Sequence, residues 1–175
     1  PNQNLAHEII IQPKMSFGTG HHATTYLMIQ QMLDMDFTDK TVLDMGCGTS
    51  VLAIFAKQKG AGKTVAIDID EWSVENSIEN AGLNGCEEIP FGLGTITDED
   101  EREYDVLLAN INRNILLAEM ADYAARIKSG GLLFLSGFYT EDIPLLLESA
   151  EKQQLNFIAQ ASKNNWACLQ LRKKS

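Results

Sequence analysis

A glycine-rich turn after a short apolar run is the pattern with the clearest chemical meaning in this sequence. Residues 42–50 (VLDMGCGTS) have the pattern of a buried strand that runs into two glycines, Gly46 and Gly48, and then a helix. Glycine lets the backbone turn sharply and approach a ligand closely, and a helix start offers free N–H groups. Asp44, at the strand end, would repel a pyrophosphate. The same carboxylate can attract a cationic amino group of a ligand, directly or through water.

Two other kinds of glycine loop bind nucleotides, and this sequence matches both poorly. The dinucleotide fingerprint G-x-G-x-x-G needs Gly or Ala at its sixth position, where this chain has Val51. A P-loop at residues 60–64 would need an earlier glycine where Lys57 stands, and a helix where the sequence predicts a strand. An NAD site and a P-loop are therefore disfavoured. A glycine turn that binds no ligand stays open as an alternative.

An acid, Asp68, stands near the end of the next predicted strand, residues 64–69. In a doubly wound sheet, an acid at this place can accept hydrogen bonds from both ribose hydroxyls of a nucleoside. Asp70 fits the N-cap of the helix that begins at Glu71. A cap or turn role is the alternative for Asp68 itself. Together with the glycine turn, Asp68 predicts a nucleoside site.

Asn110 ends another apolar run, residues 105–110. Ligands of open α/β sheets bind outside the carboxyl ends of the strands, so its amide is expected to point into that crevice. There it can hold a cofactor or orient an amine through hydrogen bonds. The alternative is that Asn110 is a turn residue, the more common role of a strand-end asparagine.

Residues 16–25 (SFGTGHHATT) are predicted to form a flexible loop before a helix. Thr24 and Thr25 could place hydroxyl and N–H groups on an anion such as a carboxylate. The alternative is a Ser or Thr N-cap with two surface histidines. His21 and His22 could be metal ligands or a base, but no third ligand accompanies them at helical or turn spacing. We therefore expect no metal site.

From about residue 40 onward, short apolar runs alternate with segments of helical period, which is the pattern of βαβ units and a mainly parallel sheet. The predicted strands are residues 41–45, 64–69, 89–93, 105–110 and 132–136, followed by an antiparallel hairpin of 156–161 and 166–171 that turns at 163–165. The predicted helices are residues 24–35, 53–59, 71–83, 115–127 and 141–153. Glycine-rich residues 17–22 are expected to cap the first helix. Residues 130–131 are expected to form a turn, and the acidic run 98–103 a solvated loop.

The composition is that of a globular chain. A length of 175 residues suits one domain, with 45% hydrophobic and 22% charged residues. A net charge of -10 supplies no field that attracts nucleic acid or anionic lipid, so neither partner is expected. No apolar run approaches the ~18 residues that a spanning helix needs. Three cysteines without C-x-x-C spacing argue against disulfides and structural zinc, and predict a reducing cytoplasm.

Taken together, these motifs resemble the PrmA-type ribosomal protein methyltransferases, which modify ribosomal protein L-eleven at the stalk base of the large subunit. The resemblance runs from about residue 11 to the C-terminus. It rests on FGTGHHATT, VLDMGCGTS, AIDID, ANINRNIL and LSGF. The glycine strand alone would indicate only a class I methyltransferase, whereas FGTG followed by His and a Thr pair is far more specific to this family.

The resemblance implies a class I, Rossmann-like α/β fold with a mainly parallel seven-stranded sheet. It also implies the transfer of methyl groups from S-adenosylmethionine to amino groups of L-eleven, on a lysine side chain or the N-terminus. The implied cofactor-binding positions are Thr25, Asp44, Gly46, Gly48, Asp68 and Asn110. Asn110, with the backbone around Ile111, is the candidate catalytic group that would hold the acceptor amine, while no residue is an evident general base.

Three features depart from the family pattern. Ser50 stands where the family usually has Gly, and Arg113 and Asn114 stand where it usually has small residues or Pro. Family members also carry an N-terminal substrate-recognition domain. We expect residues 1–175 to be a single methyltransferase domain without it, in which residues 1–39 lead into the sheet. The alternatives are a related methyltransferase acting on another protein amine or a small molecule, and a non-catalytic cofactor-binding or interaction module.

Overall fold

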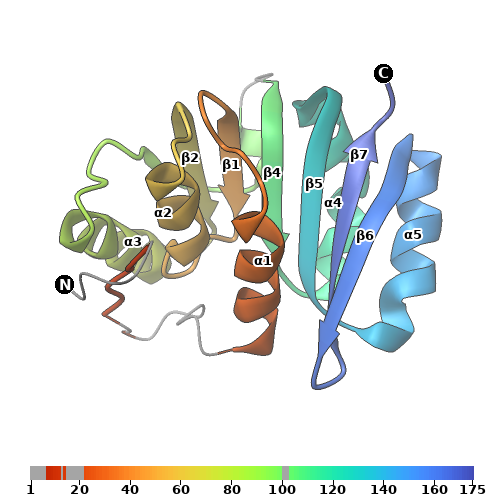
Figure 1. The fold of residues 1–175 in the computed structure, drawn as a ribbon, viewed down its shortest axis with the longest axis horizontal. Coiled ribbons are helices and arrows are strands. Elements are labelled where there is room, and N and C mark those ends of the chain that lie inside the picture. The colour runs from red at the N-terminus through yellow and green to blue at the C-terminus, as the bar shows by residue number, and fades with distance from the viewer. Residues whose placement is uncertain (1–6, 13, 15–21, 100–102) are drawn as a thin grey trace.

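Within the residues that the structure describes, which are 7–12, 14, 22–99 and 103–175, seven strands pair into one sheet. The computed structural model orders them β3-β2-β1-β4-β5-β7-β6 (Figure 1). The strands are β1 (Thr41–Met45), β2 (Lys63–Asp68), β3 (Phe91–Leu93), β4 (Tyr104–Asn110), β5 (Ile127–Tyr139), β6 (Leu155–Lys163) and β7 (Trp166–Lys173). The helices are α1 (Ala23–Leu33), α2 (Val51–Gln58), α3 (Glu71–Leu83), α4 (Arg113–Arg126) and α5 (Ile143–Lys152), with short 3-10 turns η1 (Ile96–Asp98) and η2 (Thr140–Asp142).

The strand order reverses beside β1, which makes this the place where a ligand is expected. From β1 the chain proceeds outward to β2 and β3, and it then returns to add β4 on the other side of β1. These strands and β5 are parallel, whereas β7 is antiparallel to both β5 and β6. In such sheets a crevice opens outside the carboxyl ends of the strands at the reversal. Here those ends belong to β1 and β4.

Helices cover both faces of the sheet, which explains why the central strands are continuously apolar. Val42 packs with residues of α1 and α2, whereas the next residue, Leu43, packs with residues of α4 and α5. Figure 1 shows α1, α2 and α4 on these opposite sides. Because side chains alternate along a strand, Asp44 and Asp68 lie on the same face as Val42. The candidate site therefore belongs to the face covered by α1, α2 and α3.

The predicted helices and strands are all present, with boundaries that mostly differ by one or two residues. The hairpin turn is also confirmed, because Asn164 and Asn165 have the positive φ angles, 52° and 67°, of a tight two-residue turn. Helix α4 begins two residues earlier than predicted because the Asn112 side chain accepts hydrogen bonds from the N–H groups of Asn114 and Ile115. In the acidic run, Asp98 ends η1, and residues 100–102 lie outside the described residues.

The turn predicted at residues 130–131 is wrong, because both glycines lie inside β5. The pairing of β5 with β4 jumps from Tyr104–Ile127 to Val106–Leu132, so the extra residues bulge out of the ladder. Gly130 has a φ angle of 75°, and a Cβ on Gly131 would lie 2.6 Å from the Ile127 side chain. These glycines bend the strand instead of ending it.

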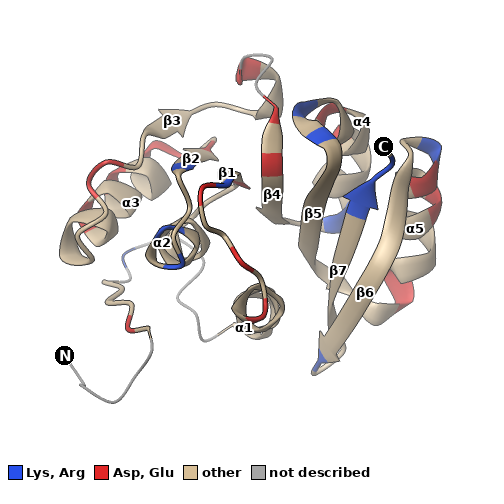
Figure 2. Cartoon of the chain, turned by 45° about the horizontal axis from the view of Figure 1, so that its top comes forward, with Lys and Arg blue, Asp and Glu red and all other residues tan. Residues whose placement is uncertain are grey.

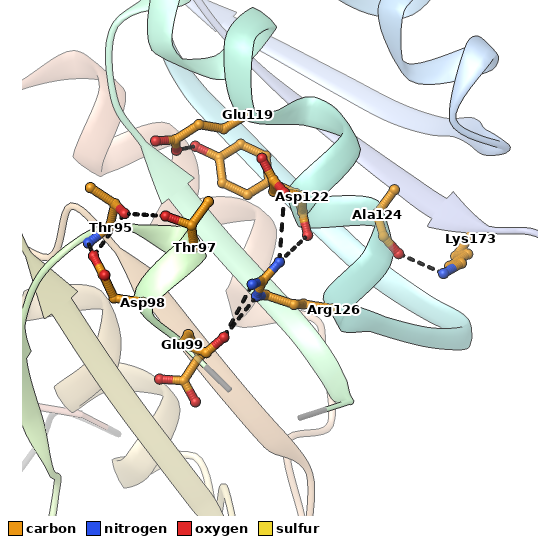
Figure 3. A network of polar contacts seen from close by, with 10 residues as sticks. Thr95, Thr97, Asp98, Glu99, Glu119, Asp122, Ala124, Arg126 and Lys173 are labelled. Atoms are coloured by element: carbon orange, nitrogen blue, oxygen red, sulfur yellow. Dashed lines mark hydrogen bonds and ion pairs between the residues drawn. The ribbon is translucent and has the colours of Figure 1, made fainter. Parts of the chain in front are cut away.

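Polar contacts anchor the chain segments that flank the sheet. The backbones of Ile10 and Gln12 form hydrogen bonds with the side chains of Asn76 and Asn80 of α3 and of Asn84, which caps the end of that helix. At the other side of the molecule, Arg126 donates to the carbonyl of Glu99, which ties the segment after η1 to the end of α4 (Figure 3). In the described part of the chain, no helix is both long and apolar enough to cross a membrane.

Candidate functional site

The turn after β1 adopts a backbone that suits glycine. Gly46 and Gly48 have φ angles of 65° and 56°, in the left-handed region that other residues avoid. The N–H groups of Gly46 and Cys47 donate to the carbonyl of Ile67 at 2.8 and 3.1 Å, which fastens the turn to β2. A Cβ on Gly46 would lie 2.9 Å from the Ile111 side chain. The turn is therefore packed between β2 and the residue that follows Asn110.

Asp44 lies beneath this turn and is 1% exposed. Its Oδ2 accepts a hydrogen bond of 3.1 Å from the N–H of Ala53, in the first turn of α2. Burial raises the pKa of Asp44 to about 7; the bond from Ala53 opposes this shift, and the negative charge of Asp68 adds to it. The sequence interpretation put this acid near the glycine turn, and the structure does so too. Its carboxylate also contributes to holding α2.

Asp68 joins the glycine turn to the start of α3. One carboxylate oxygen accepts from the N–H of Gly48 and the other from the N–H of Asp70, both at 2.9 Å. Asp70 caps α3 by accepting from the N–H of Trp72, as predicted. Beside Asp68, Ile69 and Leu93 are 70% and 60% exposed. An acid and open apolar surface therefore lie together at the carboxyl edge.

Asn110 and Thr25 meet across the edge of the sheet. The Nδ2 of Asn110 donates to the Oγ1 of Thr25 at 3.3 Å, and Thr25 is 1% exposed. The helix that carries Thr25 is capped by His22, whose Nδ1 accepts from the N–H of Thr24 at 3.4 Å. The cap is thus a histidine and not a Ser or Thr. His21 and the FGTG segment lie outside the described residues. Within the described residues, no group of three His, Cys, Asp or Glu side chains is placed to hold a metal ion.

All six residues predicted to bind the cofactor lie at one edge. In Figure 1, β1 and β4 end at the edge where α1 begins. Asp44, Gly48 and Asp68 are linked through the turn, whereas Asn110 and Thr25 form a second pair. The two groups are neighbours because β1 pairs with β4. The structure therefore brings residues from segments far apart in the sequence to one edge of the sheet.

Sequence reasoning missed the residues of α3 that support the turn from behind. Ser77 donates to the carbonyl of Gly48 at 2.9 Å, and Asn80 donates to the carbonyl of Thr49 at 3.1 Å. Both side chains are completely buried. Polar residues recur at helical spacing through this helix, together with Ser73 and Asn76, all of them buried. The available signal was a row of polar residues along the buried face of α3, where a helix that packs on a sheet usually has apolar residues.

An aromatic group at the start of α1 was also missed. The ring of Trp166 lies 5.0 Å from that of His22 and is stacked on that of Tyr139 at 4.3 Å between ring centres. Trp166 and Tyr139 are paired at the end of β5 and the start of β7, two strands whose sequence positions are far apart. Through His22, this group adjoins the start of α1, the helix that carries Thr25.

Comparison with known protein families shows which family this chain belongs to. The family described as ribosomal protein L11 methyltransferase (PrmA) matches residues 1–174. The chain belongs to the PrmA family. Its ribosomal protein L11 methyltransferase relative in Bacteroides fragilis is 51% identical over 164 residues, which cover 93% of this chain and 59% of the relative. The relative in Porphyromonas gingivalis is 52% identical over 163 residues, covering 93% and 56%. The chain thus spans less than two thirds of the length of these relatives.

Solved structures confirm the predicted fold class. The crystal structure of ribosomal protein L11 methylase from Lactobacillus delbrueckii subsp. bulgaricus matches with a TM-score of 0.87 at 25% identity, covering 94% of this chain and 84% of that one. A methyltransferase from Pyrococcus furiosus matches with a TM-score of 0.74 at 16% identity, covering 95% and 90%. The second likeness concerns the fold alone. This chain of the PrmA family has the class I methyltransferase fold, with the expected C-terminal antiparallel hairpin.

Two segments hold the positions that the resemblance marks as departures from the PrmA pattern, one at the start of α2 and one at the start of α4. Ser50 keeps a φ angle of 60°, so a residue with a side chain adopts the backbone that suits glycine. Arg113 and Asn114 form the first turn of α4, and Arg113 Nη1 pairs with Asp142 Oδ1 at 2.7 Å. Although burial opposes it, the hydrogen bond from Arg113 holds the pKa of Asp142 below its ordinary value. This pair links α4 to the start of α5.

Proposed function

We propose that this chain binds S-adenosylmethionine at the carboxyl edge of β1, β2 and β4 and transfers its methyl group to amino groups of ribosomal protein L11. One observation carries the proposal. Two acids, Asp44 and Asp68, flank the glycine turn, and neither forms an ion pair with a described residue. A ligand with a cationic amino group and a ribose diol complements these acids, whereas a pyrophosphate does not.

The donor and acceptor groups at this edge fit such a ligand. Each carboxylate oxygen can accept more than one hydrogen bond, so Asp68 can receive two ribose hydroxyls while it keeps the N–H groups of Gly48 and Asp70. Ile69 and Leu93 offer exposed apolar surface for a flat base. Asp44 would attract the amino group of the methionine part. Thr25 lies across the edge from these residues, beside Asn110.

The chemistry requires alignment more than acid or base catalysis. Bound S-adenosylmethionine supplies a methyl group that its sulfonium has already activated. Asn110 donates from its Nδ2 to Thr25. Its Oδ1 would accept a hydrogen bond from an N–H of the amine to be methylated and so orient the lone pair of that amine. The acceptor must be neutral to attack, and a lysine has an unperturbed pKa of about 10.4. Removal from water in the crevice would lower that pKa, and the proton would leave to water.

The substrate part of the proposal rests on the relatives, whose names refer to ribosomal protein L11. We place the reaction on lysine side chains or the N-terminus of that protein. Residues 1–175 would act as one methyltransferase domain, with residues 1–39 leading into the sheet. The three free cysteines, all buried, are consistent with a place in the reducing cytoplasm.

Two measurements test the proposal separately. A thermal-shift assay with S-adenosylmethionine, NAD and ATP should raise the melting temperature only with the first, because a ligand of the native state stabilises it. Stabilisation by NAD alone would refute the cofactor assignment. Transfer of a tritiated methyl group is then assayed on purified ribosomal protein L11 and on a metabolite mixture. Label found in metabolites and absent from L11 would refute the substrate and favour a related small-molecule methyltransferase.

A further inference from the structure

The buried polar face of α3 reaches the same glycine turn that Asp68 holds from the other side. We propose that Ser77 is a positioning residue for the cofactor and that its role in this chain is coupled to Ser50. This inference rests on the proposed cofactor site. It concerns how the turn keeps its shape, and it assigns a role to two serines that make no contact in the proposed mechanism.

Ser77 is the centre of a small buried network. Its Oγ donates to the carbonyl of Gly48 at 2.9 Å and accepts from the Oγ of Ser50 at 2.6 Å. The sulfur of Cys47 lies 3.5 Å from the same oxygen. Both serines are completely buried. One hydroxyl of α3 therefore contacts three residues of the turn that lie 27 to 30 positions away in the sequence.

The hydrogen bond from Ser50 to Ser77 offsets the unfavourable backbone conformation of Ser50. Ser50 lies at φ 60° and ψ 22°, the left-handed conformation that glycine adopts freely and residues with a Cβ adopt at a cost. Its hydroxyl is buried, so without a partner it would add the cost of an unmade hydrogen bond. Ser77 supplies that partner. A chain with Gly at position 50 would need neither form of compensation.

The contact with Gly48 sets the direction of the turn. The N–H of Gly48 donates to Asp68 and its carbonyl accepts from Ser77, so the residue is held at both ends. Asn80 holds the next carbonyl, that of Thr49. Because Asp68 is the proposed ribose acceptor, a change in the orientation of Gly48 would displace the carboxylate that receives the ligand. Ser77 thus acts on the cofactor through Gly48 and Asp68.

A double-mutant cycle tests the coupling. The variants are Ser77→Ala, Ser50→Gly and the double variant, and isothermal calorimetry measures the Kd for S-adenosylmethionine. Ser77→Ala should weaken binding about tenfold, which is about 1.4 kcal/mol. Ser50→Gly alone should bind within about twofold of the wild type. The double variant should bind within about threefold, because glycine removes the strain and the buried hydroxyl at position 50 and only the bond to the Gly48 carbonyl is then lost.

Further variants separate positioning from folding. Ser73→Ala removes a hydroxyl from the same buried face one turn earlier, and within the described chain Ser73 has no hydrogen bond to the turn. It should leave Kd unchanged. If Ser77→Ala fails to fold, Ser50→Ala tests the same idea, because it keeps the backbone demand and removes the hydroxyl. Ser50→Ala should weaken binding where Ser50→Gly does not. In turnover, Ser77→Ala should raise KM for S-adenosylmethionine with kcat within about twofold.

The outcomes are distinct. A wild-type chain that does not bind S-adenosylmethionine refutes the proposed function. Binding by the wild type that Ser77→Ala leaves unchanged overturns only the role of Ser77. Additive effects of the two substitutions, with no rescue by Ser50→Gly, overturn the coupling.

Discussion

Two aspartates at opposite edges of the sheet, Asp105 and Asp44, have contrasting surroundings. At the amino edge, Asp105 of β4 accepts two hydrogen bonds of 2.8 Å from Thr41 and pairs with Lys128 of β5 at 3.1 Å. Figure 2 shows acidic positions in red on β4 and basic positions in blue on the adjoining β5. At the carboxyl edge, Asp44 accepts one bond from Ala53, and the charge that acts on its pKa is that of another acid, Asp68.

The difference is visible in the pKa values. Burial disfavours the charge of Asp105, but the bonds from Thr41 and Lys128 outweigh it, so its pKa is below the ordinary value. Burial raises the pKa of Asp44 to about 7. Asp105 is paired with a lysine of the protein, whereas Asp44 forms no ion pair with a described residue. Under the proposed function, the amino edge serves stability and the carboxyl edge serves binding.

The largest expected effect is the loss of cofactor binding in Asp68→Ala. Removing two charge-assisted hydrogen bonds to ribose should weaken the Kd for S-adenosylmethionine about a hundredfold by calorimetry. Asp70→Ala is the matched control, because it removes the adjacent acid that caps α3. The control should lose stability but retain affinity. Equal affinity of Asp68→Ala and the wild type would count decisively against the ribose role.

The next effect is kinetic and concerns Asn110. Asn110→Ala should lower kcat for methyl transfer about thirtyfold, because the acceptor amine loses its orienting group. The Kd for S-adenosylmethionine should change much less. Asn114→Ala, an exposed amide in the first turn of α4, serves as the control and should retain full activity. Undiminished transfer by Asn110→Ala would remove this residue from the mechanism.

A smaller effect distinguishes the two edges by pH. The ionised form of Asp44 is the one that attracts a cationic amino group, so the affinity for S-adenosylmethionine should rise about fivefold between about pH 6 and pH 7. Asp44→Asn should abolish this dependence, and Asp70→Asn should preserve it. Cys47 stays neutral throughout, because its pKa is raised to about 12, mainly by burial and to a smaller extent by the charge of Asp44. The same slope in Asp44→Asn would assign the titration to another group.

The stability of the ligand-free chain has the opposite pH dependence at this residue. The native state holds a proton on Asp44 between the ordinary pKa of 3.8 and about 7, where the unfolded state does not. The contribution of Asp44 to the free energy of unfolding therefore decreases as the pH rises through this window. Urea titrations at several pH values should show that Asp44→Asn removes this decrease. As the pH rises toward 7, Asp44 should therefore increase the affinity for the cofactor and decrease the free energy of unfolding.

The smallest effect is expected at the amino edge. Asp105→Asn should lower the free energy of unfolding by about 1 kcal/mol, measured by urea titration, because it weakens bonds to Thr41 and Lys128. The lowered pKa means that this stabilisation is present above the unfolded pKa of 3.8 and is lost as the pH falls through the lower folded value. Cofactor affinity should not change. A tenfold loss of affinity in this variant would show that the two edges are not independent.

Much of this architecture was predictable because it depends on local patterns. The alternation of apolar runs and helical-period segments identified the βαβ units, and Asn164 and Asn165 marked the hairpin turn. Glycines were less decisive. Gly46 and Gly48 end a strand, whereas Gly130 bends one, and the composition of the two segments does not distinguish these outcomes. The neighbouring β4 ladder decides between them.

The sequence by itself determined the order of the elements, the glycine turn and the acid that follows the next strand, because propensity and side-chain period act between near neighbours. Only the tertiary structure decided which hydrogen-bond partners and charged neighbours these residues have. Asn110 meets Thr25 across 85 positions, and Ser77 meets Gly48 across 29. The raised pKa of Asp44 likewise depends on burial and on a charge carried by another strand. Contacts of this kind exist only after packing brings distant segments together.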